Sequence, residues 1–230
     1  MKKSLLSAGL VLALVASAHA QAVNWYSGTI GMTLADNSPA GATFDTTGGI
    51  WSSSPSGLID SVSVVLNISG GYNGDLFGYL VYNDGSDTRT EILLNRIGGG
   101  SNSASGSGLG TGGTTTDFVT LRSAGVTLTD GVANGIHGVS PGTGLSVAAG
   151  SSYTPDSTRT LNETFRNMKA GGTWTLFMGD MAAGDQSTLV SWGVETTAVP
   201  EPATWSLLVI GVGLQVVVTG RKKRARPLTA

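Results

Sequence analysis

Two aspartates in the segment GDMAAGD are the residues of this 230-residue chain whose types and spacing best suit a chemical role. Asp180 and Asp185 lie five positions apart in one turn, between two strand-like stretches. Calcium takes about six to eight oxygen ligands, so two carboxylates and the loop carbonyls beside them would suit it. Aspartates in turns also hydrogen-bond their own backbone, and this simpler role stays open. An acid–base pair for sugar cleavage is a weaker interpretation, because no aromatic-lined cleft can be inferred around these residues.

Other groups that could act in catalysis are scarce. His137, in the loop NGIHGVSPG, is the one histidine beyond the N-terminal segment, and we expect it to be a solvated loop side chain. A Ser–His–Asp arrangement needs a rigidly held histidine, and nothing in that loop indicates one. The chain has no cysteine, which excludes thiol catalysis, disulfide exchange and Cys-ligated metal sites. A G-x-G-x-x-G match at Gly108, Gly110 and Gly113 lacks the strand and helix that a dinucleotide site requires.

The segments that would position these residues have the patterns of β-strands. Asp60–Ile68 alternates between apolar and polar residues, as a half-buried strand does. Asp75–Tyr82 is apolar on both faces, which favours a strand inside a sandwich. Further strands are expected at Glu91–Ile97, Thr116–Leu121, Thr173–Met178 and Thr188–Thr196. In the last of these, one face is expected to carry Val190, Trp192 and Val194.

Glycine is frequent in the connections between these strands. The chain has 35 glycines, and two long stretches, Gly98–Thr116 and Gly131–Tyr153, are rich in glycine and serine or threonine. Such stretches are too poor in apolar residues to bury a core, so we expect surface loops there. Short strands, many turn signals and the lack of a strong helical pattern predict an all-β chain, folded as an antiparallel β-sandwich or jelly roll.

Both ends of the chain have the features of targeting signals. Lys2 and Lys3 precede an apolar stretch that ends in Ala18-His19-Ala20, the small-x-small pattern of a secretory signal peptide. Cleavage is expected before Gln21.

The C-terminal segment begins with Pro200, Glu201 and Pro202. An apolar span follows, Ala203–Gly220, whose 18 residues would make a helix of about 27 Å, enough to cross a hydrocarbon core. The span ends in a basic cluster formed by Arg221, Lys222, Lys223, Arg224 and Arg226. Such a cluster stays in the cytoplasm, so we expect an inner-membrane precursor with its body exported.

The body of the chain, residues 21–199, lies between these two targeting segments and is acidic. Seven of the 13 Lys and Arg residues lie in the two terminal segments, whereas 14 of the 15 Asp and Glu residues lie in the body, whose net charge is therefore near −8. Phosphate backbones would repel such a surface, which argues against nucleic-acid binding. An acidic surface is compatible with divalent cations.

Two stretches of the body resemble the P domain of proprotein convertases. The segment GTWTLFMGDMAAGDQSTLVSWGVE resembles the C-terminal signature of that family, in which Trp174, Leu176 and Trp192 match. Upstream, the segment GDLFGYLVYNDGSDT resembles its GDL strand and hairpin, with Asp75 at the matching position, although a usual proline is missing. The resemblance implies a β-sandwich jelly roll over residues 51–197. No protease sequence accompanies the domain here, so catalysis is not implied.

The C-terminal segment resembles the PEP-CTERM sorting signal of Gram-negative bacteria. The match consists of the Pro-Glu-Pro motif at 200–202, the single apolar span and the basic end. The resemblance implies recognition by an exosortase, a membrane-embedded protease or transpeptidase, and sorting to the cell envelope or the extracellular polysaccharide. A plain single-span anchor is the alternative.

The sequence therefore divides into four segments: a signal peptide (1–20), an N-terminal strand region (21–50), a P-domain-like sandwich (51–197) and a sorting signal (198–226). We expect a non-enzymatic surface or matrix protein with a structural or adhesive role, with calcium as the only candidate cofactor. Two alternatives stay open: a secreted hydrolase that uses loop carboxylates, and a regulator that binds a separate protease.

Overall fold

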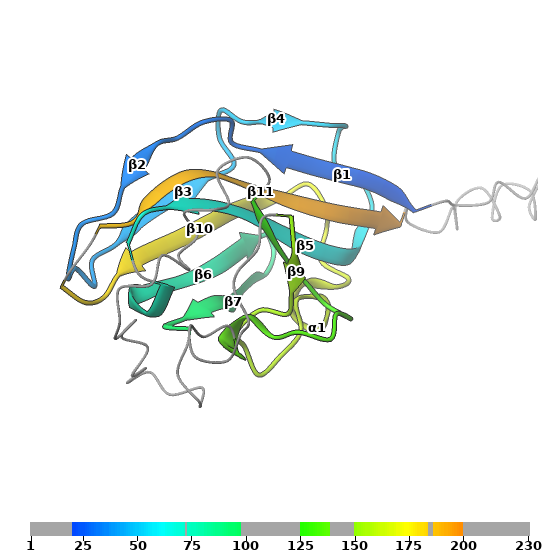
Figure 1. The fold of residues 1–230 in the computed structure, drawn as a ribbon. Coiled ribbons are helices and arrows are strands. Elements are labelled where there is room, and N and C mark those ends of the chain that lie inside the picture. The colour runs from blue at the N-terminus through cyan, green and yellow to red at the C-terminus, as the bar shows by residue number, and fades with distance from the viewer. Residues whose placement is uncertain (1–19, 72, 98–124, 139–149, 184–185, 200–230) are drawn as a thin grey trace, which may run out of the picture.

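Two β-sheets packed face to face make up almost all of the computed structural model (Figure 1), which describes residues 20–71, 73–97, 125–138, 150–183 and 186–199. The larger sheet has the strand order β4 (Ile50–Trp51), β1 (Gln21–Tyr26), β11 (Thr188–Val199), β5 (Leu58–Ser69), β8 (Val126–Thr129) and β9 (Ser152–Tyr153), and β2 (Met32–Thr33) also pairs with β11. The smaller sheet has the order β3 (Ala42–Asp45), β10 (Thr173–Asp180), β6 (Leu76–Asn83) and β7 (Thr88–Asn95). The short helical segments are η1 (Asn73–Asp75), η3 (Ile136–Gly138) and α1 (Leu161–Phe165). The all-β prediction is confirmed for these residues.

Strand β5 follows its sequence pattern closely. Every second residue from Val62 to Ile68 is buried, and the residues between them are half-buried. The apolar face points into one core cluster to which both sheets contribute, so the alternation of apolar residues fixed which side of this strand faces inward.

Strand β11 differs from the prediction at one residue. Trp192 and Val194 are buried, as expected, but Val190 is only half-buried, and Leu189 is buried instead. The pairing with β5 shifts between Leu189 and Ser191. An irregularity of this kind turns the side chains on one side of it to the opposite face.

Strand β6 is buried on one face only. Leu76, Leu80 and Tyr82 lie in the core, whereas Phe77 and Tyr79 on the opposite face are half-buried. The expected strand is present, but its two apolar faces are buried to different extents. On the outer face, Tyr79 stacks on Phe177 of β10 with ring centroids 4.6 Å apart, and this packing explains why an outward face is so apolar.

The tryptophans named in the sequence analysis lie in the core. Trp174 is 1% exposed and stacks on Tyr82, with ring centroids 3.9 Å apart, while Phe165 of α1 meets the same indole edge-on at 5.0 Å. Trp192 is 2% exposed and packs against Trp25 at 4.8 Å. These aromatic contacts join β10 to β6 and α1, and β11 to β1.

Residues 21–50, which the sequence division set apart, belong to the same two sheets. Strand β1 pairs with β11 along its whole length, from Gln21 opposite Ala198 to Tyr26 opposite Gly193. Strand β3 forms an edge of the smaller sheet, against β10. Residue 50 is therefore not a boundary between structural units.

Helix α1 begins at a capping box. The Thr160 side chain accepts a hydrogen bond from the Glu163 backbone, and the Glu163 side chain accepts one from the Thr160 backbone. The spacing of these two residues is the known signature of such a box, but the helix is only five residues long and has no visible periodicity.

Several predicted segments fall outside the described residues. They are the signal peptide, the strand at Thr116–Leu121, most of the two glycine-rich stretches, and the sorting signal from Pro200 onward. Among the residues that are described, no helix is long and apolar enough to cross a membrane.

Candidate functional site

The register between β6 and β10 brings two aspartates together. Asp180 is the last residue of β10 and pairs with Leu76, the first residue of β6. Asp75 immediately precedes Leu76, and its carbonyl accepts a hydrogen bond from the Met181 N–H at 2.7 Å. The main chain therefore places Asp75 beside Asp180 at one end of the smaller sheet, although the two residues are far apart in the sequence.

Both carboxylates are enclosed by protein. Asp75 is 2% exposed and Asp180 is fully buried. Oδ2 of Asp180 accepts a hydrogen bond from the Ser187 N–H at 3.3 Å, while Oδ1 of each aspartate is buried without a hydrogen-bond partner among the described residues. The nearest cation to Asp75 is Arg96, whose Nη2 lies 4.0 Å from Oδ1, which is too far for a hydrogen bond.

This environment disfavours the charged form of both groups. Burial, followed by the negative charge of Asp180, raises the pKa of Asp75 to about 6, although Arg96 opposes the shift. Burial also raises the pKa of Asp180, against hydrogen bonds from the backbone of Ser187 and Ala182. The charge of Asp36 raises the pKa of both aspartates. Raised pKa values that come from burial and a neighbouring like charge mark the pair as a candidate functional site.

Of the predicted calcium pair, Asp180 and Asp185, the structure describes only the first. The sequence analysis placed Asp180 in a turn, but it is the last residue of a strand and its carboxylate lies inside the protein. Asp185 lies outside the described residues. Within the described ranges, no group of three or more His, Cys, Asp or Glu side chains is arranged to hold a metal ion.

A second polar cluster lies around Asp156, and here the prediction for His137 was wrong. His137 belongs to η3, its side chain is 17% exposed, and its Nδ1 lies 2.7 Å from Oδ2 of Asp156. The Asp156 side chain is fully buried and also accepts a hydrogen bond from the Asn95 N–H at 3.1 Å. Burial raises the pKa of Asp156, while the bond to His137 opposes the shift. The sequence could not reveal this pair, because 18 residues separate its members.

Glu91 is held beside this cluster. Its carboxylate accepts hydrogen bonds from the hydroxyl groups of Ser157 and Thr164, and the residue is 6% exposed. The letters GVSPG that begin at Gly138 match G-x-S-x-G, a pattern that marks a nucleophile only at a strand-to-helix turn. Here they follow a 3-10 helix, and residues 139–149 lie outside the description. The cluster as described joins β7, η3 and α1, and Glu91, Asp156 and the half-buried Ser157 line a cavity of about 410 Å³ beside it.

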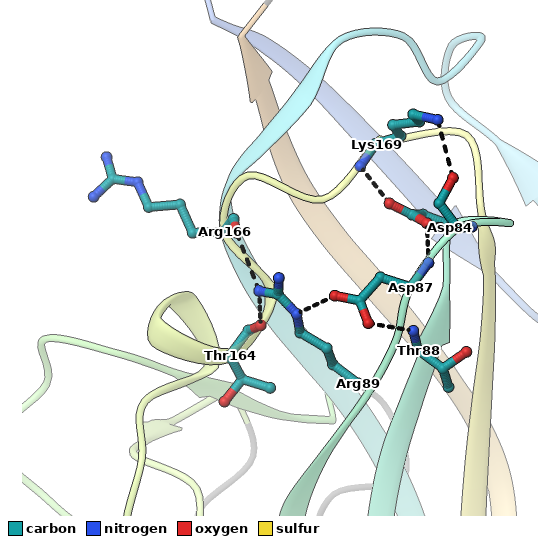
Figure 2. A network of polar contacts seen from close by, with 8 residues as sticks. Asp84, Asp87, Thr88, Arg89, Thr164, Arg166 and Lys169 are labelled. Atoms are coloured by element: carbon teal, nitrogen blue, oxygen red, sulfur yellow. Dashed lines mark hydrogen bonds and ion pairs between the residues drawn. The ribbon is translucent and has the colours of Figure 1, made fainter.

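An exposed polar network connects the β6–β7 hairpin to the segment after α1 (Figure 2). Arg89 Nε lies 2.8 Å from Oδ2 of Asp87, and Arg89 Nη1 donates to the carbonyl of Thr164 at 2.8 Å. Asp84 accepts from the backbone N–H groups of Asp87 and Lys169. Each of these groups has a structural partner, so the network serves to hold the hairpin in place.

A small cavity of about 220 Å³ opens between the sheets, beside the paired indoles of Trp25 and Trp192. Asp45 and Thr47 supply polar groups to its wall. The indole N–H groups of both tryptophans are buried and have no hydrogen-bond partner among the described residues. At about 220 Å³ the cavity is smaller than most small-ligand sites.

The sorting motif at Pro200, Glu201 and Pro202 and the basic residues after it lie outside the described residues. The structure does show where the chain enters the sandwich and where it leaves it. Gln21, the expected first residue of the mature protein, pairs with Ala198. The start of β1 and the end of β11 therefore lie side by side at the same end of the larger sheet (Figure 1).

Comparison with known proteins gives little. No family model matches the sequence, and no curated protein matches it. Among solved structures, the chain is similar to one in the complex of the Aeromonas sobria serine protease with its chaperone, with 15% sequence identity and a TM-score of 0.41. The match covers 78% of this chain but only 27% of that one. A likeness this distant carries no argument about function.

Proposed function

We propose that this chain is an exported, non-enzymatic surface or matrix protein, which a C-terminal PEP-CTERM signal delivers to an exosortase for sorting. Its body is a P-domain-like jelly roll with a structural or adhesive role. The precursor is held at the inner membrane by its apolar span until processing near Pro200–Pro202 releases the body to the envelope or the extracellular polysaccharide.

The observation that supports this proposal best is the position of the two junctions. The first strand begins at Gln21, directly after the expected signal-peptide cleavage site, and the last strand ends at Val199, directly before the Pro-Glu-Pro motif. Removal of the signal peptide or of the sorting signal would thus leave every described strand intact. The proline-rich motif would lie immediately outside the fold, where a membrane-embedded processing enzyme could reach it.

The carboxylates of the body support a non-enzymatic role. Asp75, Asp156 and Asp180 have enclosed side chains, and Glu91 is held by two hydroxyl groups. A general acid or base must come within hydrogen-bond reach of its substrate. Asp75 and Asp180 are buried. Glu91 and Asp156 line a cavity of about 410 Å³, but their carboxylates are already bonded to Ser157, Thr164 and His137.

The proposal is tested by altering the motif while keeping the span. Pro200→Ala and Glu201→Ala should each leave the protein at precursor size in the inner membrane of a host that has an exosortase, because the anchor persists while recognition is lost. Immunoblots of membrane, envelope and matrix fractions report the size and location. Pro227→Ala is the matched control, since it removes a proline from the same tail outside the motif.

Two results would contradict the proposal. The same mature size and location for the motif variants and the parent would show that the motif is not read. Turnover of peptides or polysaccharides by the purified chain would show that the body is an enzyme.

A further inference from the structure

The pair formed by Asp75 and Asp180 is fixed by the backbone. Asp180 lies opposite Leu76 in the β6–β10 ladder, and the Met181 N–H extends that ladder to the Asp75 carbonyl. The Asp180 carbonyl accepts a further hydrogen bond from the Ser38 N–H at 2.7 Å. These hydrogen bonds hold the two backbones side by side, so the carboxylates can move apart only by rotation of their side chains, both of which are buried.

Each aspartate offers one oxygen that the described protein does not satisfy. Oδ1 of Asp75 and Oδ1 of Asp180 are buried and accept no hydrogen bond from the described residues. Buried polar atoms in folded proteins nearly always have a partner, because the loss of water is otherwise uncompensated. Two such atoms on neighbouring carboxylates indicate a partner that both can share. That partner has to be a cation or a hydrogen-bond donor.

Charged neighbours also act on the pair. Asp36, which is half-buried, acts electrostatically on both aspartates, and Arg96 acts on Asp75 in the opposite sense. A cation bound between Asp75 and Asp180 would offset the repulsion between their carboxylates.

We propose that a calcium ion binds between Asp75 and Asp180, through the Oδ1 atom of each. Calcium suits a site of oxygen ligands whose geometry need not be regular, whereas magnesium demands a near-ideal octahedron. Zinc favours histidine and cysteine ligands, and the described surroundings of the pair provide neither. Because two carboxylates form only part of a calcium shell, carbonyl or water oxygens would complete it. The proposal concerns the sandwich and does not depend on the sorting signal.

The test is a set of thermal melts of the full chain in a mild detergent, after removal of metal ions, with chelator or with added calcium. Calcium at a hundredfold excess over its Kd should raise the Tm of the parent by about 5 °C or more, because it binds the folded state alone. Asp75→Asn and Asp180→Asn should lose most of that rise. Asp45→Asn is the matched control, because Asp45 is exposed and bonds Thr47 within its own turn.

The melts in chelator test the proposal a second way, through the Tm of the metal-free protein. There, both asparagine variants should melt at or above the parent, because a neutral amide removes the repulsion that the metal-free pair suffers. Calorimetric titration with calcium should give one ion per parent chain, and a Kd at least about tenfold weaker in each variant. If one variant does not fold, the titration of the other still reports whether the ion lies at this pair.

Three outcomes would overturn the proposal. The parent could bind no calcium at millimolar concentration. It could bind calcium with a Kd that neither asparagine variant changes, which would place the ion elsewhere. The Asp45→Asn control could lose the calcium response as fully as the two variants, which would make the effect one of general surface charge.

Discussion

Replacing Trp174 by alanine should be among the most damaging single changes to the sandwich. The indole is 1% exposed and lies between Tyr82 of β6 and Phe165 of α1. Truncating a buried tryptophan to alanine costs about 3–5 kcal/mol through lost transfer energy and a residual cavity. Two aromatic contacts are lost as well, each worth about 0.5–1.5 kcal/mol beyond the buried area, so we expect a value near the upper end of that range.

Such a loss is large compared with the stability of a typical domain, about 5–15 kcal/mol. For a body of this size, each kcal/mol corresponds to about 2–4 °C in Tm, so Trp174→Ala should lower the Tm by about 10–20 °C. The assay is thermal unfolding of the full chain, followed by far-ultraviolet circular dichroism because tryptophan fluorescence changes with the variant itself.

Two companion variants make the result interpretable. Trp174→Phe keeps a ring between Tyr82 and Phe165 and should lose clearly less. Trp51→Ala removes a half-buried indole from the two-residue strand β4, where about 1 kcal/mol is expected. If Trp174→Ala lowers the Tm no more than Trp51→Ala does, the packing described here between β10, β6 and α1 is wrong.

Two further predictions concern Tyr82 and the α1 cap. Burial raises the pKa of Tyr82 to about 12, so the stability it contributes is complete below pH 10 and is lost as the pH rises from 10 through 12. The Tm difference between the parent and Tyr82→Phe should therefore shrink across that window, and a constant difference would contradict the assigned cause. Thr160→Ala removes half of the capping box and should cost about 1 kcal/mol; Thr158→Ala, at an exposed neighbour, should cost much less, and equal losses would mean that the cap is not formed.

The sequence predicted the fold where a strand buries one regular face. The alternation in β5 and the apolar segments of β6 and β10 are visible in the letters, and so are Trp174 and Trp192 as core residues. It failed at Val190, because the irregularity in the pairing after Leu189 depends on two strands at once. It expected strands in residues 21–50, but it could not show that β1 joins the larger sheet, because that depends on its pairing with β11, more than 160 positions away.

The sequence pointed to each residue of the candidate cation site but not to their proximity, because that also depends on the pairing of two strands. Asp180 was identified from its turn-like neighbourhood, and Asp75 from its place in a family-like GDL segment, but nothing in the letters joined them. Their proximity follows from the antiparallel register that sets Leu76 opposite Asp180. A register is decided by the whole length of two strands, through the pairing of their buried faces, and a shift by two residues would keep every apolar side chain inside while separating the two carboxylates. The repulsion between Asp75 and Asp180 is thus a consequence of core packing, and a bound cation would compensate for it where that packing brings these like charges together.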